Sequence, residues 1–205
     1  MMKMVNCKKH SPHDNILPNS RKNGGQRLIN EMPIFRVKDA PHFDHENWRL
    51  IVNGLVKKPL RLSYDEILKL PKVHLTDDFT CVDGWKVKDV EWAGVRIKTI
   101  IGLAEPTPSA RYAVFKAGGF TTTLALTEAN RDEAILAHEH TGQPLTFEHG
   151  APLRLIFPSQ ECFYSVKWVN VIELRAKYLE GTGKNIALTR IKPKTSPPNL
   201  KFKKT

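Results

Sequence analysis

The most reactive side chain in this sequence is the thiol of Cys81, in the stretch Asp77–Trp85. An alternating segment ends at this cysteine and a polar turn with a glycine follows, so a rigid strand would present the thiol to a cleft. A cysteine thiolate in such a place can act as a nucleophile or bind a soft metal ion. Cysteine is also a common small apolar filler of protein cores, and that alternative stays open on this residue alone.

A second group of reactive side chains occurs in Glu148–Arg154 and Ser165–Trp168, where His149, Arg154 and Lys167 flank apolar stretches. Burying two permanent cations without an anion is costly, so the cluster indicates an anion site if it is inside the protein. Arginine offers a planar fork for a phosphate, lysine a point charge and histidine a further donor. The equal alternative is that all three side chains face solvent at strand edges.

Short strands and helices must position these residues. Strands are expected over 48–56, 74–82, 90–97 (with a bend), 111–116, 120–126, 153–157 and 166–174, and helices over 63–70, 98–104 and 127–137. Ser63 followed by Glu66 is a capping box, which marks the first helix, and Thr127 can cap the third. Ala117–Gly119 predicts either a hairpin turn or a close approach of backbone to a ligand. Because strands and helices alternate irregularly, the sequence predicts an α+β fold with antiparallel or mixed sheets.

The length of 205 residues and the 40% hydrophobic content predict one domain with tails. We divide the chain into a basic arm (1–30), a domain (31–178) and a basic C-terminal tail (179–205). Residues 1–30 carry six Lys/Arg and one acid, residues 176–205 carry eight and one, and residues 31–175 carry 18 and 19. The charge of +11 therefore lies in the tails, which are expected to be solvated. Binding of nucleic acid or acidic surfaces through them is unlikely but stays an alternative.

A cytoplasmic, reducing location is expected. No apolar run approaches the length of about 18 residues that a membrane span needs, and no apolar segment follows the basic N-terminus as in a secretory signal. Cys7, Cys81 and Cys162 lie far apart in the sequence, so they form neither a disulfide framework nor a Cys-x-x-Cys zinc site.

Several segments, taken in order, carry a resemblance to a known family. They are Cys81–Trp85, Trp92–Val95, Gly118–Thr122, His149–Arg154 and Ser165–Trp168. Over about residues 30 to 180 the chain resembles the molybdopterin-binding domain of the sulfite oxidase family, and it is most similar to the short, stand-alone members. The resemblance implies that family's fold and its cofactor, molybdenum with molybdopterin.

The resemblance also implies roles for individual residues. Cys81 would be the thiolate ligand of molybdenum. The residues that would hold the pterin and its phosphate are His149, Arg154 and Lys167, with Ser165 close enough to help and Arg36 as a further contact from an N-terminal strand.

The family resemblance further implies two-electron oxygen-atom transfer on a small substrate. Sulfite oxidases carry an Asn-Arg-Arg run after their cysteine, whereas Trp85 and Lys86 stand here, and lysine cannot reproduce a bidentate grip on sulfite. The run Cys81–Trp85 is instead similar to the branch with the periplasmic molybdenum protein that reduces methionine sulfoxides. Reduction of a sulfoxide or N-oxide is therefore favoured over oxidation of sulfite. Asp83 matches an acidic position of that branch and would relay a proton, with a simple turn role as the equal alternative.

The chain carries no heme segment and no immunoglobulin-like dimerisation domain of the kind found in sulfite oxidases. We therefore expect a separate electron carrier, either a protein or a small molecule, and a monomer or weak homodimer. Two further alternatives stay open. One is a cysteine hydrolase that pairs Cys81 with His138, His140 or His149. The other is a degenerate family member that folds without a cofactor.

Overall fold

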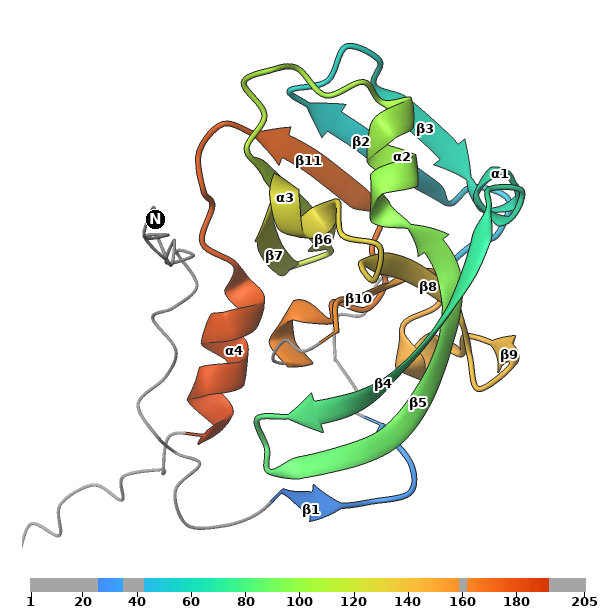
Figure 1. Cartoon of the computed structure of the whole chain (residues 1–205), viewed down its shortest axis with the longest axis vertical. Helices are drawn as coiled ribbons and strands as arrows, with labels where there is room; N and C mark the ends of the chain where they lie inside the picture. Colours follow the sequence, from blue (N-terminus) through green and yellow to red (C-terminus); the bar gives the residue numbers. More distant parts are fainter. Residues whose placement is uncertain (1–25, 35–42, 159–161, 192–205) are drawn as a thin grey trace, which may run out of the picture.

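A computed structural model describes residues 26–34, 43–158 and 162–191. Two sheets dominate this part of the chain (Figure 1). The first contains β1 (Arg27–Leu28), β4 (Lys72–Cys81), β5 (Trp85–Arg96), β8 (Ile135–His140), β9 (Gln143–Pro144) and β10 (Arg154–Ile156). The second contains β2 (Arg49–Gly54), β3 (Leu60–Ser63), β6 (Tyr112–Ala117), β7 (Phe120–Ala125) and β11 (Val171–Arg175).

The helices are short and lie between or beside the sheets (Figure 1). They are α1 (Tyr64–Leu68), α2 (Ile97–Leu103), α3 (Leu126–Ala129), α4 (Thr182–Ile191) and the 3-10 turns η1 (Phe147–His149) and η2 (Cys162–Tyr164). The strand order is β1-β5-β8-β10 in the first sheet, with β4 along β5 and β9 along β8, and β3-β2-β11-β6-β7 in the second. The pairs β1–β5 and β2–β11 are parallel and the others are antiparallel. The expected α+β class with mixed sheets is confirmed.

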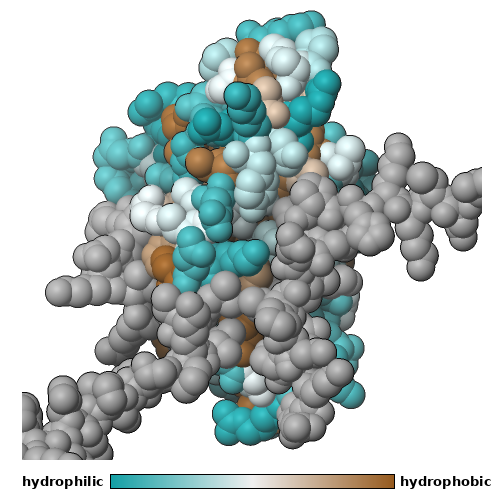
Figure 2. Space-filling view, turned by 90° about the vertical axis from the view of Figure 1, so that its left-hand side faces the viewer, coloured by the Kyte–Doolittle hydropathy of each residue, from teal (hydrophilic) through white to brown (hydrophobic). Residues whose placement is uncertain are grey.

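Hydrophobic side chains pack into two clusters. The larger one fills the space between the second sheet, α2 and β10, and includes Phe115, Leu155 and Ile172. The smaller one lies on the first sheet around Trp85 and Trp92 and includes Cys81 at its edge. On the face shown in Figure 2 the described residues are mainly hydrophilic, and hydrophobic ones appear as small separate patches. Among the described residues no helix is both long and apolar enough to cross a membrane.

A long, curved hairpin of β4 and β5 carries Cys81 at the end of its first strand (Figure 1). Cys81 pairs with Trp85, and the N–H of Gly84 donates to the Cys81 carbonyl at 3.1 Å. Gly84 has a φ of 86°, which glycine adopts without strain, so a three-residue turn fits between the strands. The expected strand over 74–82 and the turn after Cys81 are both confirmed.

Local capping signals predicted the first helix correctly. The Ser63 hydroxyl accepts the N–H of Glu66 at 3.2 Å, and the Glu66 carboxylate accepts the N–H of Ser63 at 2.8 Å. This reciprocal pair starts α1 where the capping box predicts it. Of the two alternatives for Ala117–Gly119, the hairpin turn is present, because Ala117 pairs with Phe120 across the turn.

The predicted helix over 127–137 is wrong. Helix α3 ends at Ala129, and Ile135–His140 forms β8 between β5 and β10. Residues 135–137 are fully buried, and a short apolar run of this kind has the same sequence pattern in a buried strand and in a helix. The predicted strand over 166–174 is shorter than expected, since regular pairing begins only at Val171.

Helix α4 falls in the stretch 179–205 that the charge pattern assigns to a tail. Its beginning is bonded to β7 and the turn before it: the Thr121 N–H donates to the Thr182 hydroxyl, which donates to the Gly119 carbonyl, both at 2.9 Å. This part of the chain is therefore attached to the second sheet. Strand β1 likewise falls within residues 1–30 and pairs with β5.

Two glycines test the packing of the hairpin. A Cβ at Gly94 on β5 would lie 2.1 Å from the Leu136 carbonyl oxygen, so Gly94→Ala should lower the free energy of unfolding by more than about 2 kcal/mol. In α2, a Cβ at the exposed Gly102 would meet no atom within 4 Å. Gly102→Ala is the control and should raise stability by about 0.5–1 kcal/mol. Urea denaturation measures the unfolding free energy of both variants. Equal changes in this free energy would contradict the close contact of β5 with β8.

Candidate functional site

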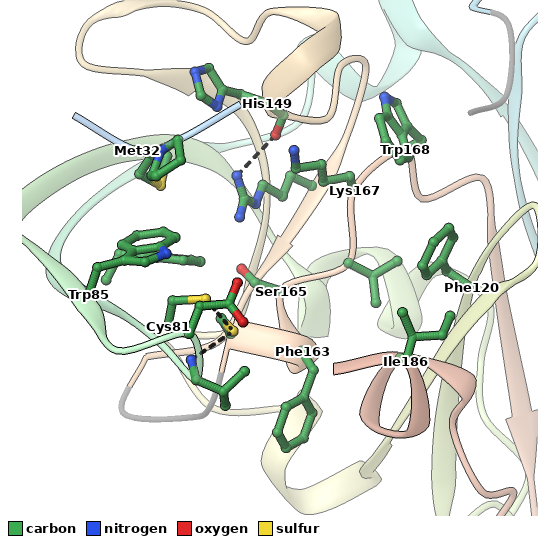
Figure 3. Close-up of a pocket in the computed structure, with 18 residues that line it drawn as sticks. Met32, Cys81, Trp85, Phe120, His149, Phe163, Ser165, Lys167, Trp168 and Ile186 are labelled. Atoms are coloured by element: carbon green, nitrogen blue, oxygen red, sulfur yellow. Dashed lines mark hydrogen bonds between the residues drawn. The ribbon is translucent and has the colours of Figure 1, made fainter. Parts of the chain in front are cut away.

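Most of the residues that the sequence singles out line one cavity of about 160 Å³ (Figure 3). Its lining includes Cys81, Asp83, His149, Arg154, Ser165 and Lys167. The remaining wall is mostly apolar and is formed by Met32, Pro33, Phe79, Val82, Trp85, Phe120, Phe163, Val166, Trp168 and Ile186, together with Cys162 and Gly183. Arg36 lies outside the described residues.

Cys81 is only 5% exposed, and its sulfur lies 3.3 Å from the sulfur of Cys162. This distance is longer than a disulfide bond, which is about 2.05 Å. The hydrogen bond with Cys162 raises the pKa of the Cys81 thiol well above its usual range, and burial raises this pKa further. The thiol is therefore protonated at neutral pH. A bound metal cation would reverse this, since coordination deprotonates a thiol.

Arg154 is the buried cation of the site. It is 5% exposed, and its guanidinium carbon lies 5.0 Å from the ring centre of Phe79 and 5.2 Å from that of Trp92. One terminal nitrogen donates to the His149 carbonyl at 3.1 Å, whereas Nε has no hydrogen-bond partner among the described residues. Burial lowers the pKa of Arg154 to about 10, so the side chain stays charged at neutral pH.

An anionic group would fit this guanidinium. A buried N–H without an acceptor costs free energy, and so does a buried charge without a counterion. No carboxylate of the described residues forms an ion pair with Arg154. An anion in the cavity would supply both an acceptor and a counterion.

Lys167 and His149 are brought together by a close backbone contact. Gly150 follows His149 with a φ of 113°, and a Cβ there would lie 2.9 Å from the Lys167 Cβ. The backbone N–H of Trp168 donates to the Gly150 carbonyl at 3.1 Å. Glycine at this position therefore lets the two segments approach one another.

Both residues of this pair line the same cavity and are labelled in Figure 3. The Lys167 ammonium donates to the carbonyl of Glu148 and lies 5.6 Å from the ring centre of Trp168. Burial lowers the pKa of His149, and the cations Arg154 and Lys167 lower it further. His149 is therefore a neutral imidazole at pH 7, while the lysine and arginine carry the positive charge.

Ser165 and Asp83 complete the polar part of the lining. The Ser165 hydroxyl donates to the Leu155 carbonyl at 2.8 Å, which leaves its oxygen as an acceptor. Asp83 belongs to the turn after Cys81, and its backbone N–H donates to the Cys81 sulfur. The structure thus brings six of the seven predicted site residues to one pocket.

The pocket also contains residues that the sequence did not suggest. Cys162 lies far from Cys81 in the sequence, and Ile186 comes from α4, within the stretch 179–205 that the charge pattern assigns to a tail. Neither residue belongs to a local pattern that predicts a site. Within residues 26–34, 43–158 and 162–191, no group of three or more His, Cys, Asp or Glu side chains is placed to hold a metal ion.

The geometry does not favour a cysteine hydrolase. His138 and His140 do not line the pocket; His138 is buried on β8, and His140 packs against Trp92 with ring centres 4.7 Å apart. His149 shares the pocket with Cys81, but the raised pKa of the Cys81 thiol is the opposite of what an activated nucleophile needs.

Known proteins match most of the domain. The family described as "Oxidoreductase molybdopterin binding domain" matches residues 37–182. A protein of Bacillus subtilis named "Uncharacterized oxidoreductase YuiH" is 36% identical over 150 residues, which are 72% of this chain and 76% of that protein.

Two further relatives are named protein-methionine-sulfoxide reductase catalytic subunit MsrP. The one from Campylobacter jejuni is 28% identical over 174 residues, and the one from Gluconobacter oxydans is 30% identical over 146 residues. These alignments cover 74% and 62% of this chain but only 57% and 46% of the two reductases.

Among solved structures, the sulfane dehydrogenase SoxCD from Paracoccus pantotrophus superimposes with a TM-score of 0.61 at 23% sequence identity. The superposition covers 67% of this chain and 40% of that one. This likeness shows the fold and, with the family match, confirms the expected fold type.

The pH dependence of stability tests the burial of His140, whose pKa is lowered to about 4 by burial first and then by His149 and Arg154. The unfolded chain binds a proton near the ordinary pKa of about 6.5, so the folded state loses stability as pH falls from about 6.5 to about 4. His140→Gln removes this titration. We expect the variant to lose less unfolding free energy than the wild type between pH 7.5 and pH 5 in urea titrations.

The exposed His74 on β4 provides the control for this measurement. His74→Gln should keep the pH dependence of the wild type. Identical pH profiles for the wild type and His140→Gln would contradict the burial described above.

Proposed function

Since this chain belongs to the family of oxidoreductase molybdopterin-binding domains, and is therefore an oxidoreductase, we propose that it binds molybdenum with molybdopterin in the pocket beside Cys81 and reduces a small sulfoxide or N-oxide. The family membership confirms the resemblance found in the sequence. The observation that carries the proposal is that the buried Arg154, whose Nε has no acceptor within the described residues, shares one cavity with the Cys81 thiol. One side chain requires an anion and the other can bind a soft metal, and a phosphorylated metal-binding cofactor provides both.

In this proposal the chain holds the cofactor from two directions. Cys81 loses its proton and binds the metal from the end of β4. Arg154 and Lys167 donate charge-assisted hydrogen bonds to the anionic phosphate, and neutral His149 adds a further contact. The Ser165 hydroxyl, whose proton is donated to the Leu155 carbonyl, accepts one hydrogen bond at the same wall. When bound, the cofactor supplies two-electron oxygen-atom transfer, and the protein fixes its orientation.

The apolar wall of the pocket keeps this chemistry away from bulk water. Trp85 and Phe163 lie on opposite sides of the Cys81 sulfur in Figure 3, and both line the cavity. Low local water content strengthens the electrostatic contacts of Arg154 with a bound anion. It also favours a substrate with apolar substituents over a strongly hydrated dianion.

Two observations support reduction of a sulfoxide over oxidation of sulfite. Lys86, where sulfite oxidases carry arginine, forms an ion pair with Asp78 and does not line the pocket. Two relatives, which are 28% and 30% identical to this chain, are named as methionine-sulfoxide reductases. Reduction of a sulfoxide consumes two electrons and two protons and releases water. Asp83, which lines the pocket two residues after Cys81, holds and delivers a proton at its carboxylate.

The electrons come from a separate carrier in this proposal. A protein or small redox carrier would have to reach the pocket to deliver them. The expected state of a monomer or weak homodimer stays a prediction.

The metal ligand is tested by Cys81→Ala. The variant should fold, because alanine is a small apolar residue at the edge of a hydrophobic cluster, but it should lose turnover of methyl sulfoxides with a reduced dye as electron donor. Circular dichroism, metal analysis and the activity assay measure the three properties. Wild-type protein from a host grown without molybdate should be inactive as well.

Full activity of Cys81→Ala with stoichiometric molybdenum would contradict the assignment of Cys81 as the metal ligand. Turnover of sulfite by the wild type, in the absence of sulfoxide reduction, would contradict the proposed direction of the reaction. Absence of molybdenum from wild-type protein made in molybdate-rich medium would favour a family member that folds without a cofactor.

The anion site is tested by Arg154→Met, which keeps an unbranched side chain but removes the charge. Charge-assisted hydrogen bonds contribute about 1.5–3 kcal/mol each, so the pterin content of purified protein should fall by about tenfold or more. Fluorescence of the oxidised pterin measures this content. Arg61→Met, on the exposed face of β3, is the matched control and should keep the wild-type content. Equal pterin content in both variants would contradict the role of Arg154.

A further inference from the structure

Cys162 is a second thiol in the pocket, and the proposed function does not use it. It is the first residue of η2, is partly buried and lines the cavity next to Cys81. The two sulfurs come from segments 81 residues apart in the chain and lie 3.3 Å from each other. A contact this close between a predicted metal ligand and another thiol requires an explanation.

Backbone hydrogen bonds fix the position of the Cys162 sulfur. The N–H of Val82, the residue after Cys81, donates to this sulfur at 3.5 Å. The Ser165 N–H donates to the Cys162 carbonyl at 3.0 Å and closes the turn of η2. Figure 3 shows the hydrogen bonds beside the labelled Cys81 as dashed lines. The sulfur of Cys162 is thus held against the turn that carries Cys81.

The direction of the sulfur–sulfur hydrogen bond depends on the state of Cys81. Between two neutral thiols either S–H can donate. A metal-bound thiolate has no proton, so Cys81 could then only accept, and Cys162 would have to donate. The chain Val82 N–H to Cys162 S–H to Cys81 sulfur would then run in one direction and end at the metal ligand.

Hydrogen bonds to a ligating thiolate change the electronic properties of the bound metal. They withdraw electron density from the sulfur, which weakens its donation and raises the reduction potential of the metal. They also fix the orientation of the ligand, as outer-shell partners do in other metal sites. The same effect moves the absorption band that arises from sulfur-to-metal charge transfer.

We propose that Cys162 is a positioning residue that donates an S–H···S hydrogen bond to the Cys81 thiolate, orients it toward the metal and raises the reduction potential of the metal. This inference rests on the proposed function, because it requires a metal on Cys81. It assigns Cys162 no contact with the substrate.

Three variants of the cofactor-loaded protein test the inference. Cys162→Ala removes the donor, so the reduction potential should shift to a more negative value and the charge-transfer band to longer wavelength. Cys162→Ser keeps a donor and should move both properties back toward the wild-type values. Tyr164→Phe changes a side chain of η2 that does not line the cavity and keeps both thiols, so it should leave the potential and the band unchanged.

A redox titration followed by electron paramagnetic resonance, together with absorption spectra, measures these shifts at equal molybdenum content. A loaded Cys162→Ala protein with the wild-type potential and band would overturn the inference while the proposed function stands. If the alanine variant takes up less molybdenum, full loading of the serine variant supports the inference and an equal loss in both overturns it. Absence of molybdenum from the wild type would overturn the proposed function as well.

Discussion

A buried guanidinium that forms no ion pair with any carboxylate in the described part of the chain is the constraint on which the pocket depends. The Arg154 guanidinium contacts the rings of Phe79 and Trp92, and these contacts with aromatic faces offset only part of the cost of burying its charge. Its Nε lacks an acceptor among the described residues. If the protein never bound an anion, it would be more stable with an apolar residue at this position. The cation is therefore best explained by a ligand whose binding it stabilises.

The fold brings this cation and the thiol together from distant parts of the chain. The β4–β5 hairpin carries Cys81 to its tip, while β10 holds Arg154 beneath the aromatic residues of the same hairpin. The close contact at Gly150 then fixes Lys167 beside His149. Because β5 and β10 both pair with β8, the relative positions of thiol and guanidinium depend on one continuous sheet.

Local patterns in the sequence predicted the elements that have local causes. The capping box at Ser63 and the strand that ends at Cys81 are of this kind, and both are confirmed. β8 was mistaken for a helix because its burial depends on two neighbouring strands that no local pattern records. The contact of Cys162 with Cys81 was missed for the same reason, since it joins segments with no sequence relation.

The family resemblance implied which residues share the pocket, but their roles and the cytoplasmic location stay predictions. X-ray absorption at the molybdenum edge tests the central claim most directly, because it counts the sulfur atoms bound to the metal. The account predicts that the loaded wild type shows one more sulfur ligand than a loaded Cys81→Ser protein. An equal number of sulfur ligands in the two proteins would contradict it.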